Sequence, residues 1–380
     1  MRDHLIVLCT ATVVTALVTP VVRRLATAAG AVVAPDERRV HERPTATSGG
    51  AAMLVGLFAA VGVATQLPTY EPVFAGSTEP VGVLIAATVI FLVGLLDDLR
   101  EVSAPAKVTG QALAGVVLYA LGVTMFFFKV PVLGVVVLGP ELAPLVTVLW
   151  VVLMANAINL IDGLDGLAAG VVAIAAGAFF LYSLLLRDEG QIGPENVGPL
   201  VALATVGLCL GFLVHNVHPA KIFMGDSGAL LLGLLMAAST MVVGGRANDQ
   251  FAGGTYFFFA PVAIPFLVLG VALLDTVFAI ARRATRRVGL STPDKDHLHH
   301  RLLRLGHTHR QSVAILWAWT LLLSATALYP AFAGSAGAFV PIGVAAAALV
   351  GFTVLVPRLA RDDGDDQPAE PTRSRHVHRT

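Results

Sequence analysis

The chain has 380 residues with 25 basic and 25 acidic side chains, so its formal net charge is zero. Only 13% of the residues are charged and 56% are hydrophobic, and the mean hydropathy is +0.79. Soluble domains contain about 25% charged residues. The composition therefore excludes a soluble globular protein and indicates an integral membrane protein.

Apolar runs long enough to cross a bilayer recur along the chain. A helix needs about 20 apolar residues to span the hydrocarbon core, and helices satisfy their own backbone hydrogen bonds there. We therefore predict an all-α polytopic membrane fold with about eleven transmembrane helices. They are expected at about 4–22, 49–66, 81–96, 108–125, 142–158, 167–186, 198–214, 228–244, 258–281, 314–333 and 337–356.

The segments outside these runs are short. Residues 126–140 are apolar but contain Lys129 and Pro131, which predicts an external hairpin or a re-entrant piece. The first apolar run is followed by a basic pair rather than by a cleavage site, so we interpret it as a helix and not as a signal peptide. Residues 1–356 are expected to form one membrane domain. Residues 357–380 lack apolar periodicity and are predicted to be a disordered cytoplasmic tail.

Basic residues predict the orientation of the helices. With the N-terminus outside, the inside loops and tail contain 21 of the 25 basic residues and the outside segments contain 4. Cytoplasmic loops carry an excess of Lys and Arg. We therefore expect an N-out, C-in topology. Cys9 and Cys209 both fall within predicted spans and indicate no disulfide framework.

Acidic and amide side chains gather near the helix ends of the inside loops. Asp97 and Asp98 close the third predicted helix, and Asp226 precedes the eighth. Carboxylates at the edge of hydrocarbon are costly unless a cation or a donor pairs with them. Each residue alone has an ordinary explanation as a helix cap or an interhelical contact. Their clustering on one side favours a site, which also includes Asn156, Asn159, Asp162 and Asp165 at the end of the fifth helix.

Basic side chains accompany these acidic residues. The chain has only four lysines, and Lys107, Lys221 and Lys295 lie in the inside loops. The last long inside loop adds a histidine-rich stretch. Zinc is disfavoured there, because no cysteine assists and no HExxH spacing occurs. Carboxylates facing cations are what Mg²⁺ and phosphate groups require, and the loop supplies His297, His299, His300 and Arg301.

Four motifs in this order carry a family resemblance: DDLREVSAPAKVTGQ, NAINLIDGLDGLAAG, NVHPAKIFMGDSGALLLG and DKDHLHHRLLRLG. Together they resemble the polyprenyl-phosphate N-acetylhexosamine-1-phosphate transferase family over roughly residues 30–310. The first inside loop, PDERRVHERPTATSGG, resembles the start of the family and contains the candidates Arg38 and His41. The DHLHH stretch resembles the branch that transfers GlcNAc-1-phosphate.

The resemblance implies a reaction and its partners. UDP-GlcNAc and polyprenyl phosphate, undecaprenyl or decaprenyl, would give polyprenyl-diphosphate-GlcNAc and UMP, with Mg²⁺ required and Mn²⁺ as an alternative ion. This would be the first membrane step of a cell-envelope glycan, in a bacterial cytoplasmic membrane with the site facing the cytoplasm. A phospho-MurNAc-pentapeptide transferase, or another hexosamine-1-phosphate transferase of the same family, is the alternative. A homodimer is a candidate assembly, and no nucleic-acid partner is expected.

The resemblance also implies residue roles. Asp97, Asp98 and Asp226 are the expected catalytic residues, with Asp226, Asp98 and Asn159 as metal ligands. A phosphate monoester has a second pKa near 6, so the lipid phosphate needs little help from a base, and Asp97 or Asp98 would orient it or finish its deprotonation. The expected substrate-binding residues are Lys107, Asn156, Asn159, Asp162, Asp165, Lys221, His297, His299, His300 and Arg301.

Two positions depart from the family pattern. Val33 stands where the family often has Asp, and Ala229 stands where it often has Ser. The first departure affects the predicted nucleotide contacts of the first loop. A further candidate is Asp275, which lies within the ninth predicted helix, because an intramembrane Asp is a candidate functional residue.

Two other protein classes fit the sequence less well. A secondary transporter should show repeated halves with broken helices near the bilayer midplane, but the polar residues here gather at one face and no repeat is visible. The CDP-alcohol phosphotransferases also use a DG-containing aspartate motif. This chain lacks the Ala-Arg and the later paired Asp of that motif.

Overall fold

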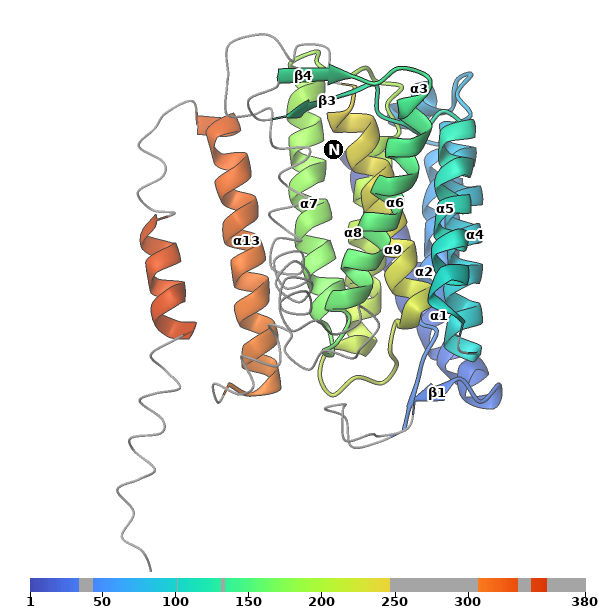
Figure 1. Cartoon of the computed structure of the whole chain (residues 1–380). Coiled ribbons are helices and arrows are strands. Elements are labelled where there is room, and N and C mark those ends of the chain that lie inside the picture. The colour runs from blue at the N-terminus through green and yellow to red at the C-terminus, as the bar shows by residue number, and fades with distance from the viewer. Residues whose placement is uncertain (34–43, 101, 131–133, 247–306, 334–342, 354–380) are drawn as a thin grey trace, which may run out of the picture.

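The structure is a computed structural model that describes residues 1–33, 44–100, 102–130, 134–246, 307–333 and 343–353. The described part of the chain is a bundle of roughly parallel and antiparallel helices (Figure 1). The predicted span at 258–281 and the predicted disordered tail lie outside these residues.

The described helices follow the predicted apolar runs, except for the two short helices at residues 68–74, which were not predicted. They are α1 (Arg2–Ala28), α2 (Gly50–Ala64), η1 (Pro68–Tyr70), α3 (Glu71–Phe74), α4 (Glu79–Leu99), α5 (Ala104–Ala120), α6 (Leu142–Ile161), α7 (Leu167–Asp188), α8 (Gly198–Asn216), α9 (Gly225–Gly244), α13 (His309–Ala333) and a short helix at Gly343–Thr353.

Six described helices are long and apolar enough to cross a membrane, namely α1, α4, α6, α7, α8 and α9. A seventh is added if the bent pair formed by α2 and Pro68–Phe74 counts as one span. A helical membrane protein with several spans is therefore confirmed. The number eleven and the orientation of the termini remain predictions.

Helix boundaries differ from the predicted runs where local chemistry overrides hydropathy. The apolar run at 49–66 predicts a single helix that ends near residue 66. In the structure a second, short helical segment, Pro68–Phe74, follows at an angle of 95°. Pro68 starts this segment because its ring fixes a helical φ without needing a backbone donor. The first helix continues past Arg23 and Arg24 to Ala28, since long basic side chains at a membrane edge can reach water.

Two small hairpins interrupt the helical architecture, so the prediction of an exclusively helical fold is incomplete. The hairpin predicted at 126–140 is confirmed as β3 (Phe127–Val130) paired antiparallel with β4 (Gly134–Val137). A second pair joins β1 (Val32–Val33) to β2 (Thr45–Ala46). The two hairpins lie at opposite ends of the helical bundle (Figure 1).

Helix α9 is the centre of the bundle. Its apolar window is completely buried, and it contacts α2, α4, α6, α7 and α8. By contrast, α1 exposes Leu5, Val13, Leu17 and Leu25 on its outer face, as expected for a helix that faces lipid. A charged residue at the start of α9 is therefore held by helices on several sides.

Small residues allow the close contact between α4 and α9. A Cβ added at Gly94 of α4 would lie 2.5 Å from the carbonyl oxygen of Asp226 and 2.5 Å from Cα of Ser227. Both are backbone atoms, which cannot move away without displacing α9. Membrane helices use small residues at such contacts because they let the two backbones approach.

We expect Gly94→Ala to lower the melting temperature of the detergent-purified protein by several degrees, because overpacking of this kind costs about 1–3 kcal/mol. Thermal unfolding followed by intrinsic fluorescence would measure the change. The matched control is Gly62→Ala in α2, where an added Cβ meets nothing within 4 Å. Equal melting temperatures of the two variants would contradict a tight α4–α9 contact.

Candidate active site

Four helix ends meet at one end of the bundle, the lower end in Figure 1. The last turn of α4 carries Asp97 and Asp98, and the start of α5 carries Lys107. The last turns of α6 carry Asn159, and the first turn of α9 carries Asp226. The sequence motifs that lie far apart in the chain are thus brought together by the helix packing.

Asp226 joins two other helices of this cluster through its carboxylate. Its Oδ1 accepts a hydrogen bond from Nδ2 of Asn159 at 2.9 Å, and its Oδ2 forms an ion pair with Lys107. The same ammonium group lies 2.6 Å from Oδ2 of Asp97. These three charged side chains are each about one fifth exposed. One lysine therefore balances two carboxylates at the boundary between the helical bundle and water.

The position of Lys107 is unusual for a lysine. It lies in the first turns of α5, where the partial positive charge of the helix end disfavours a cation. Its two carboxylate partners supply the compensating charge. Removing Lys107 would leave Asp97 and Asp226 facing each other in a partly buried site, which is unfavourable for like charges.

Asp98 points away from this ion pair and holds the start of α9. Its Oδ1 accepts the backbone N–H of Asp226 at 2.8 Å, and its Oδ2 accepts the hydroxyl of Ser227 at 2.7 Å and the N–H of Ser227 at 3.3 Å. The N-cap residue Met224 provides no side-chain hydrogen bond. Asp98 thus supplies, from another helix, the acceptor that a helix N-terminus needs.

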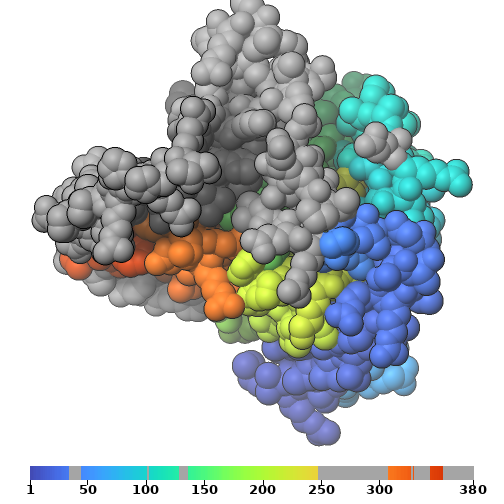
Figure 2. All heavy atoms as spheres, turned by 90° about the horizontal axis from the view of Figure 1, so that it is seen from below, coloured from blue at the N-terminus to red at the C-terminus, as the bar shows by residue number. Residues whose placement is uncertain are grey.

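Glycine is required where α9 starts. Gly225 has a φ of +68°, and a Cβ added there would lie 2.5 Å from both carboxylate oxygens of Asp98. The preceding segment is fixed by backbone hydrogen bonds, since Phe223 donates to Ala46 at 2.9 Å and Gly49 donates to Phe223 at 3.0 Å. Figure 2 views this end, with the segment before α9 in yellow-green beside the N-terminal segments in blue.

Asp162 follows the last turn of α6 and is partly buried. No hydrogen bond or ion pair joins its carboxylate to any residue that the structure describes. Burial raises its pKa to about 8, and the negative charges of Asp226, Asp98 and Asp165 add to the effect. A carboxylate in such surroundings is stabilised in its ionised form by an added cation.

A second polar contact lies one helical turn deeper in the bundle. Gln111 of α5 is fully buried, four residues after Lys107, and its Oε1 accepts a hydrogen bond from Nδ2 of Asn156 at 2.7 Å. Asn156 lies three residues before Asn159 on α6. The Gln111–Asn156 contact therefore joins the two helices whose next turns supply Lys107 and Asn159 to Asp226.

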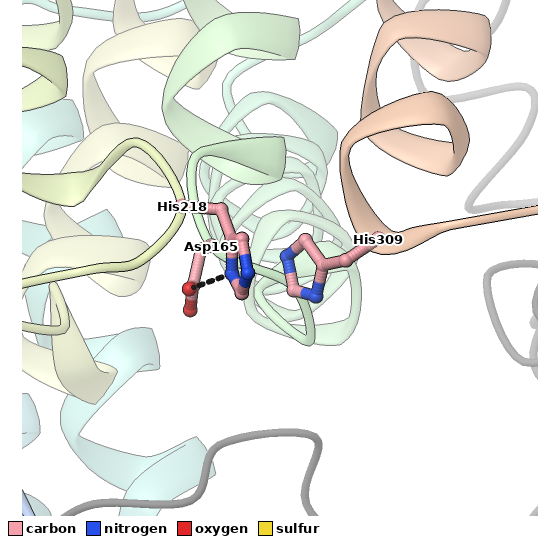
Figure 3. Close-up of side chains that lie close together, drawn as sticks. All are labelled: Asp165, His218 and His309. Atoms are coloured by element: carbon pink, nitrogen blue, oxygen red, sulfur yellow. Dashed lines mark hydrogen bonds and ion pairs between the residues drawn. The ribbon is translucent and has the colours of Figure 1, made fainter.

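Asp165 belongs to a different group of side chains. Its Oδ2 lies 2.7 Å from Nδ1 of His218 and accepts the backbone N–H of Ala220 at 3.0 Å. The ring of His218 stacks on that of His309 at a centroid distance of 4.2 Å (Figure 3). The prediction placed Asp165 with the other polar residues of the α6–α7 loop, whereas the structure directs its side chain toward the α8–α9 loop and α13.

The remaining predicted residues fall into two groups. Lys221 has an exposed side chain, and no ion pair or side-chain hydrogen bond joins it to the described part of the chain. The other candidates lie outside the described residues, so their predicted roles stay predictions. They are Arg38, His41, Asp275, His297, His299, His300 and Arg301.

Sequence reasoning missed four residues around the cluster. The sequence could have indicated Gln111 as a site residue, because it is polar and lies four positions after Lys107, on the same helix face. Ser227 follows Asp226 directly and was included only within the motif. His218 and His309 gave little signal, because lone histidines near helix ends are common and only the fold brings these two together.

The fold and the cluster define a class of protein. It is a multi-helix membrane protein whose chemistry would take place at the membrane boundary, where carboxylates, an amide and one lysine converge. Hard oxygen ligands suit Mg²⁺, and a lysine suits a phosphate group.

Comparison with known proteins agrees with this class. The sequence model described as glycosyl transferase family 4 matches residues 80–244. The decaprenyl-phosphate N-acetylglucosaminephosphotransferase of Mycobacterium tuberculosis is 39% identical over 373 residues, which cover 96% of this chain and 91% of that protein. The probable undecaprenyl-phosphate N-acetylglucosaminyl 1-phosphate transferase of Bacillus subtilis is 36% identical over 82% of this chain and 80% of that protein.

A relative that is named for a different activity also matches. The phospho-N-acetylmuramoyl-pentapeptide-transferase of Desulforudis audaxviator is 34% identical over 77% of this chain and 86% of that protein. Identity and coverage at these levels show common descent. The chain belongs to glycosyl transferase family 4, and it is a membrane transferase.

We expect the stability of the metal-free protein to fall as pH rises, in part through Asp162. The folded protein keeps a proton on this carboxyl up to about pH 8, whereas the unfolded chain releases it near the ordinary value of 3.8. The folded state therefore binds more protons between these values, and its stability decreases as pH increases. Melting temperatures measured with a chelator between about pH 6 and pH 8.5 should show this slope.

The slope should be smaller in Asp162→Asn, which cannot ionise. Asp188→Asn, which removes an exposed carboxylate at the end of α7, is the matched control and should keep the wild-type slope. Parallel curves for wild type and Asp162→Asn would argue against a buried, proton-bound Asp162.

We also expect energetic coupling between Gln111 and Asn156. Asn156→Leu leaves the buried Gln111 amide without its partner, which costs about 1–3 kcal/mol. Gln111→Leu costs less, because the Nδ2 of Asn156 still donates to the carbonyl of Val152. The double variant removes both amides, so its loss of stability should be smaller than the sum of the single losses. Melting temperatures of the four proteins would measure the coupling.

The control for this cycle pairs Gln111→Leu with Thr109→Val. The hydroxyl of Thr109 is exposed and bonds the carbonyl of Pro105 in its own helix, so these two changes should add. Full additivity in the Gln111–Asn156 cycle would contradict a stabilising contact between the two amides.

Proposed function

We propose that the protein transfers GlcNAc-1-phosphate from UDP-GlcNAc to polyprenyl phosphate, releasing UMP and leaving polyprenyl-diphosphate-GlcNAc. The observation that carries the proposal is the convergence of Asp97, Lys107, Asn159 and Asp226 at one end of a membrane bundle. A lipid phosphate can reach this position from the bilayer, and a nucleotide sugar can reach it from water. The GlcNAc-1-phosphate transferases named above support the same reaction.

The relatives favour GlcNAc over MurNAc-pentapeptide as the donor sugar. The mycobacterial protein, whose name specifies N-acetylglucosamine, aligns with 96% of the chain, whereas the muramoyl-pentapeptide transferase aligns with 77%. The two reactions share the phosphate chemistry and differ in the sugar. The pentapeptide donor is therefore the second candidate, and it requires no change in the roles of the cluster.

The donor set fits a divalent cation of the Mg²⁺ type, with Mn²⁺ as the alternative. The Asn159 amide is hydrogen-bonded to Asp226, and Asp162 lies near enough for the charge of Asp226 to act on its carboxyl, so two carboxylates and an amide offer oxygen ligands. Asp162 has no partner among the described residues. We propose Asp226 and Asn159 as the principal ligands, with Asp162 beside them. The bound ion would neutralise charge on the diphosphate of the donor.

Asp98 has a different proposed role from the one predicted. Both of its carboxylate oxygens accept hydrogen bonds from the start of α9. As a metal ligand Asp98 would have to release the start of α9, whereas Asp226 would exchange only side-chain contacts with Lys107 and Asn159. We propose that Asp98 positions Asp226 by holding the helix end on which Asp226 sits.

Lys107 and Asp97 are proposed to handle the lipid phosphate. The Lys107 ammonium lies between two carboxylates, and a cation bound at Asp226 would weaken its attraction to that carboxylate. The ammonium could then bind a phosphate oxygen as a compact point charge. Asp97 would orient the lipid phosphate or accept its last proton, since most of this phosphate is already a dianion near neutral pH.

The location and assembly follow the same proposal. We propose a multi-pass protein of the bacterial cytoplasmic membrane with the cluster facing the cytoplasm, where nucleotide sugars are made, and a homodimer as a candidate assembly. Asp165, Lys221 and the histidine-rich loop would contact the nucleotide or the sugar phosphate. Supporting this orientation, 21 of 25 basic residues belong to loops assigned to the inside.

The test is an assay of purified protein with polyprenyl phosphate and Mg²⁺. UDP-GlcNAc, UDP-GalNAc and UDP-MurNAc-pentapeptide are offered separately, UMP release is measured, and the lipid product is identified by mass spectrometry. We expect UMP and lipid-linked GlcNAc from UDP-GlcNAc alone. UMP from only the pentapeptide donor would replace the donor and keep the mechanism, and no UMP from any donor would overturn the proposed function.

The variant Asp226→Asn should reduce UMP release by at least about 100-fold, because a residue that holds charge in the transition state contributes on the order of 3 kcal/mol or more. Glu79→Gln is the matched control, since Glu79 pairs with Arg246 near the N-terminal end of α4. It should retain activity close to that of the wild type. Wild-type turnover by a folded Asp226→Asn protein would exclude Asp226 from the mechanism.

A further inference from the structure

We propose that Asp165, His218 and His309 form a transition-metal site of the zinc type, separate from the carboxylate cluster at Asp226. The three residues come from three chain segments: the α6–α7 loop, the α8–α9 loop and the first residue of α13. Nothing in the reaction proposed above assigns a metal to them. The proposal does not depend on that reaction.

The geometry brings one donor atom from each residue into a small volume. The donor atoms all lie within 4.8 Å of one another, and the shortest separation is 2.7 Å between Oδ2 of Asp165 and Nδ1 of His218. Figure 3 shows the three side chains side by side, with His218 in the middle. Ligands of tetrahedral zinc, at bond lengths of about 2.0–2.2 Å, lie roughly 3.4 Å apart. A metal lies in the plane of the imidazole that binds it, so one of the two stacked rings would have to turn out of the stack to complete the site.

The surroundings of His309 point to a missing ligand. Neither of its ring nitrogens is exposed to solvent, and neither meets full hydrogen-bond geometry with a described residue, although the backbone of Asp165 lies close to the ring. A buried polar atom without a partner costs about 1–3 kcal/mol. A metal bound to one of these nitrogens would remove that cost. The neighbouring His218 ring is stacked on His309 at 4.2 Å with an interplanar angle of 22°, which keeps the two imidazoles close together.

The ligand types select the metal. Two imidazoles and one carboxylate are a ligand set of zinc sites that keep a fourth position for water or another ligand. Mg²⁺ prefers oxygen ligands, which the cluster at Asp226 offers. The carboxylate of Asp165 also accepts the N–H of Ala220 at 3.0 Å. This second hydrogen bond orients the Asp165 carboxylate, as the outer partners of metal-binding side chains usually do.

A metal at this position would connect α13 to the loops of the active site. His309 is the first residue of α13, and Arg310 already bonds the carbonyl of His218 at 3.1 Å. Further along the same helix, the Trp317 indole donates to the carbonyl of Leu167 at 3.4 Å. Asp165 lies in the α6–α7 loop, three residues after Asp162. A metal bound to Asp165 would therefore tie this loop both to the α8–α9 loop and to α13.

The test uses the full chain with an affinity tag that contains no histidine. The protein is expressed with added Zn²⁺, purified, dialysed against metal-free buffer and analysed for metals by inductively coupled plasma mass spectrometry. We expect about one zinc per chain, with a loss of most of it in His309→Ala and in His218→Ala. Replacement by Co²⁺ should give the visible absorption bands of a four-coordinate ion, and these bands should disappear in His309→Ala.

Two further variants separate a metal site from a folding defect. His307→Ala is the matched control, since His307 lies on the same segment and its Nε2 bonds the carbonyl of Thr353 at 3.0 Å. It should keep the zinc. His309→Cys supplies a thiolate ligand, so it should also keep the metal and should add a sulfur-to-cobalt charge-transfer band.

Two results would overturn the proposal. One is wild-type protein that elutes as a single species but binds no zinc or cobalt. The other is an equal metal content in wild type and His309→Ala, which would assign the metal to other histidines of the chain. Metal content is measured without substrate, so this outcome is independent of whether the protein transfers GlcNAc-1-phosphate.

Discussion

The contact between the end of α4 and the start of α9 is the constraint on which the rest of the site depends. Asp98 accepts hydrogen bonds from the backbone of Asp226 and from Ser227, and Gly94 lets the two helix backbones approach. Because α9 is the central helix, its position determines where α2, α6 and α8 pack. The orientation of Asp226 is therefore coupled to the core of the protein rather than to a mobile loop.

Charge balance at the membrane boundary explains why the cluster has this composition. Two carboxylates near hydrocarbon require a compensating cation, and Lys107 provides it in the described structure. Asp162 has no ion pair with this ammonium group, and burial, followed by the charges of Asp226, Asp98 and Asp165, raises the pKa of Asp162. In the proposed function, a divalent cation would replace the proton of Asp162 and offset the charge of Asp226. The same residues would then serve both to fold without substrate and to bind a metal–diphosphate complex.

Side-chain hydrogen bonds also connect the loops around the cluster to one another. Asn216 accepts the N–H of Gly166 at 3.0 Å and donates to the carbonyl of Ile222 at 2.9 Å, so one buried amide joins the α6–α7 and α8–α9 loops. Asp165 and His218 make the next connection, toward α13. Rigid loops of this kind hold ligand-binding residues close to the geometry that binding requires.

The amino-acid sequence by itself determined the membrane class, most helices and the main acidic residues, because hydropathy and motif order are local properties. It also assigned Asp97, Asp226, Asn159 and Lys107 to one site, since polar residues at hydrocarbon edges are costly without a function. The family resemblance added the reaction. Only the tertiary structure decided that Asp98 supports a helix end, that Asn156 pairs with Gln111, and that Asp165 meets His218 and His309. Each of these contacts joins residues from different helices or loops, and the packing of those elements sets which side chains meet.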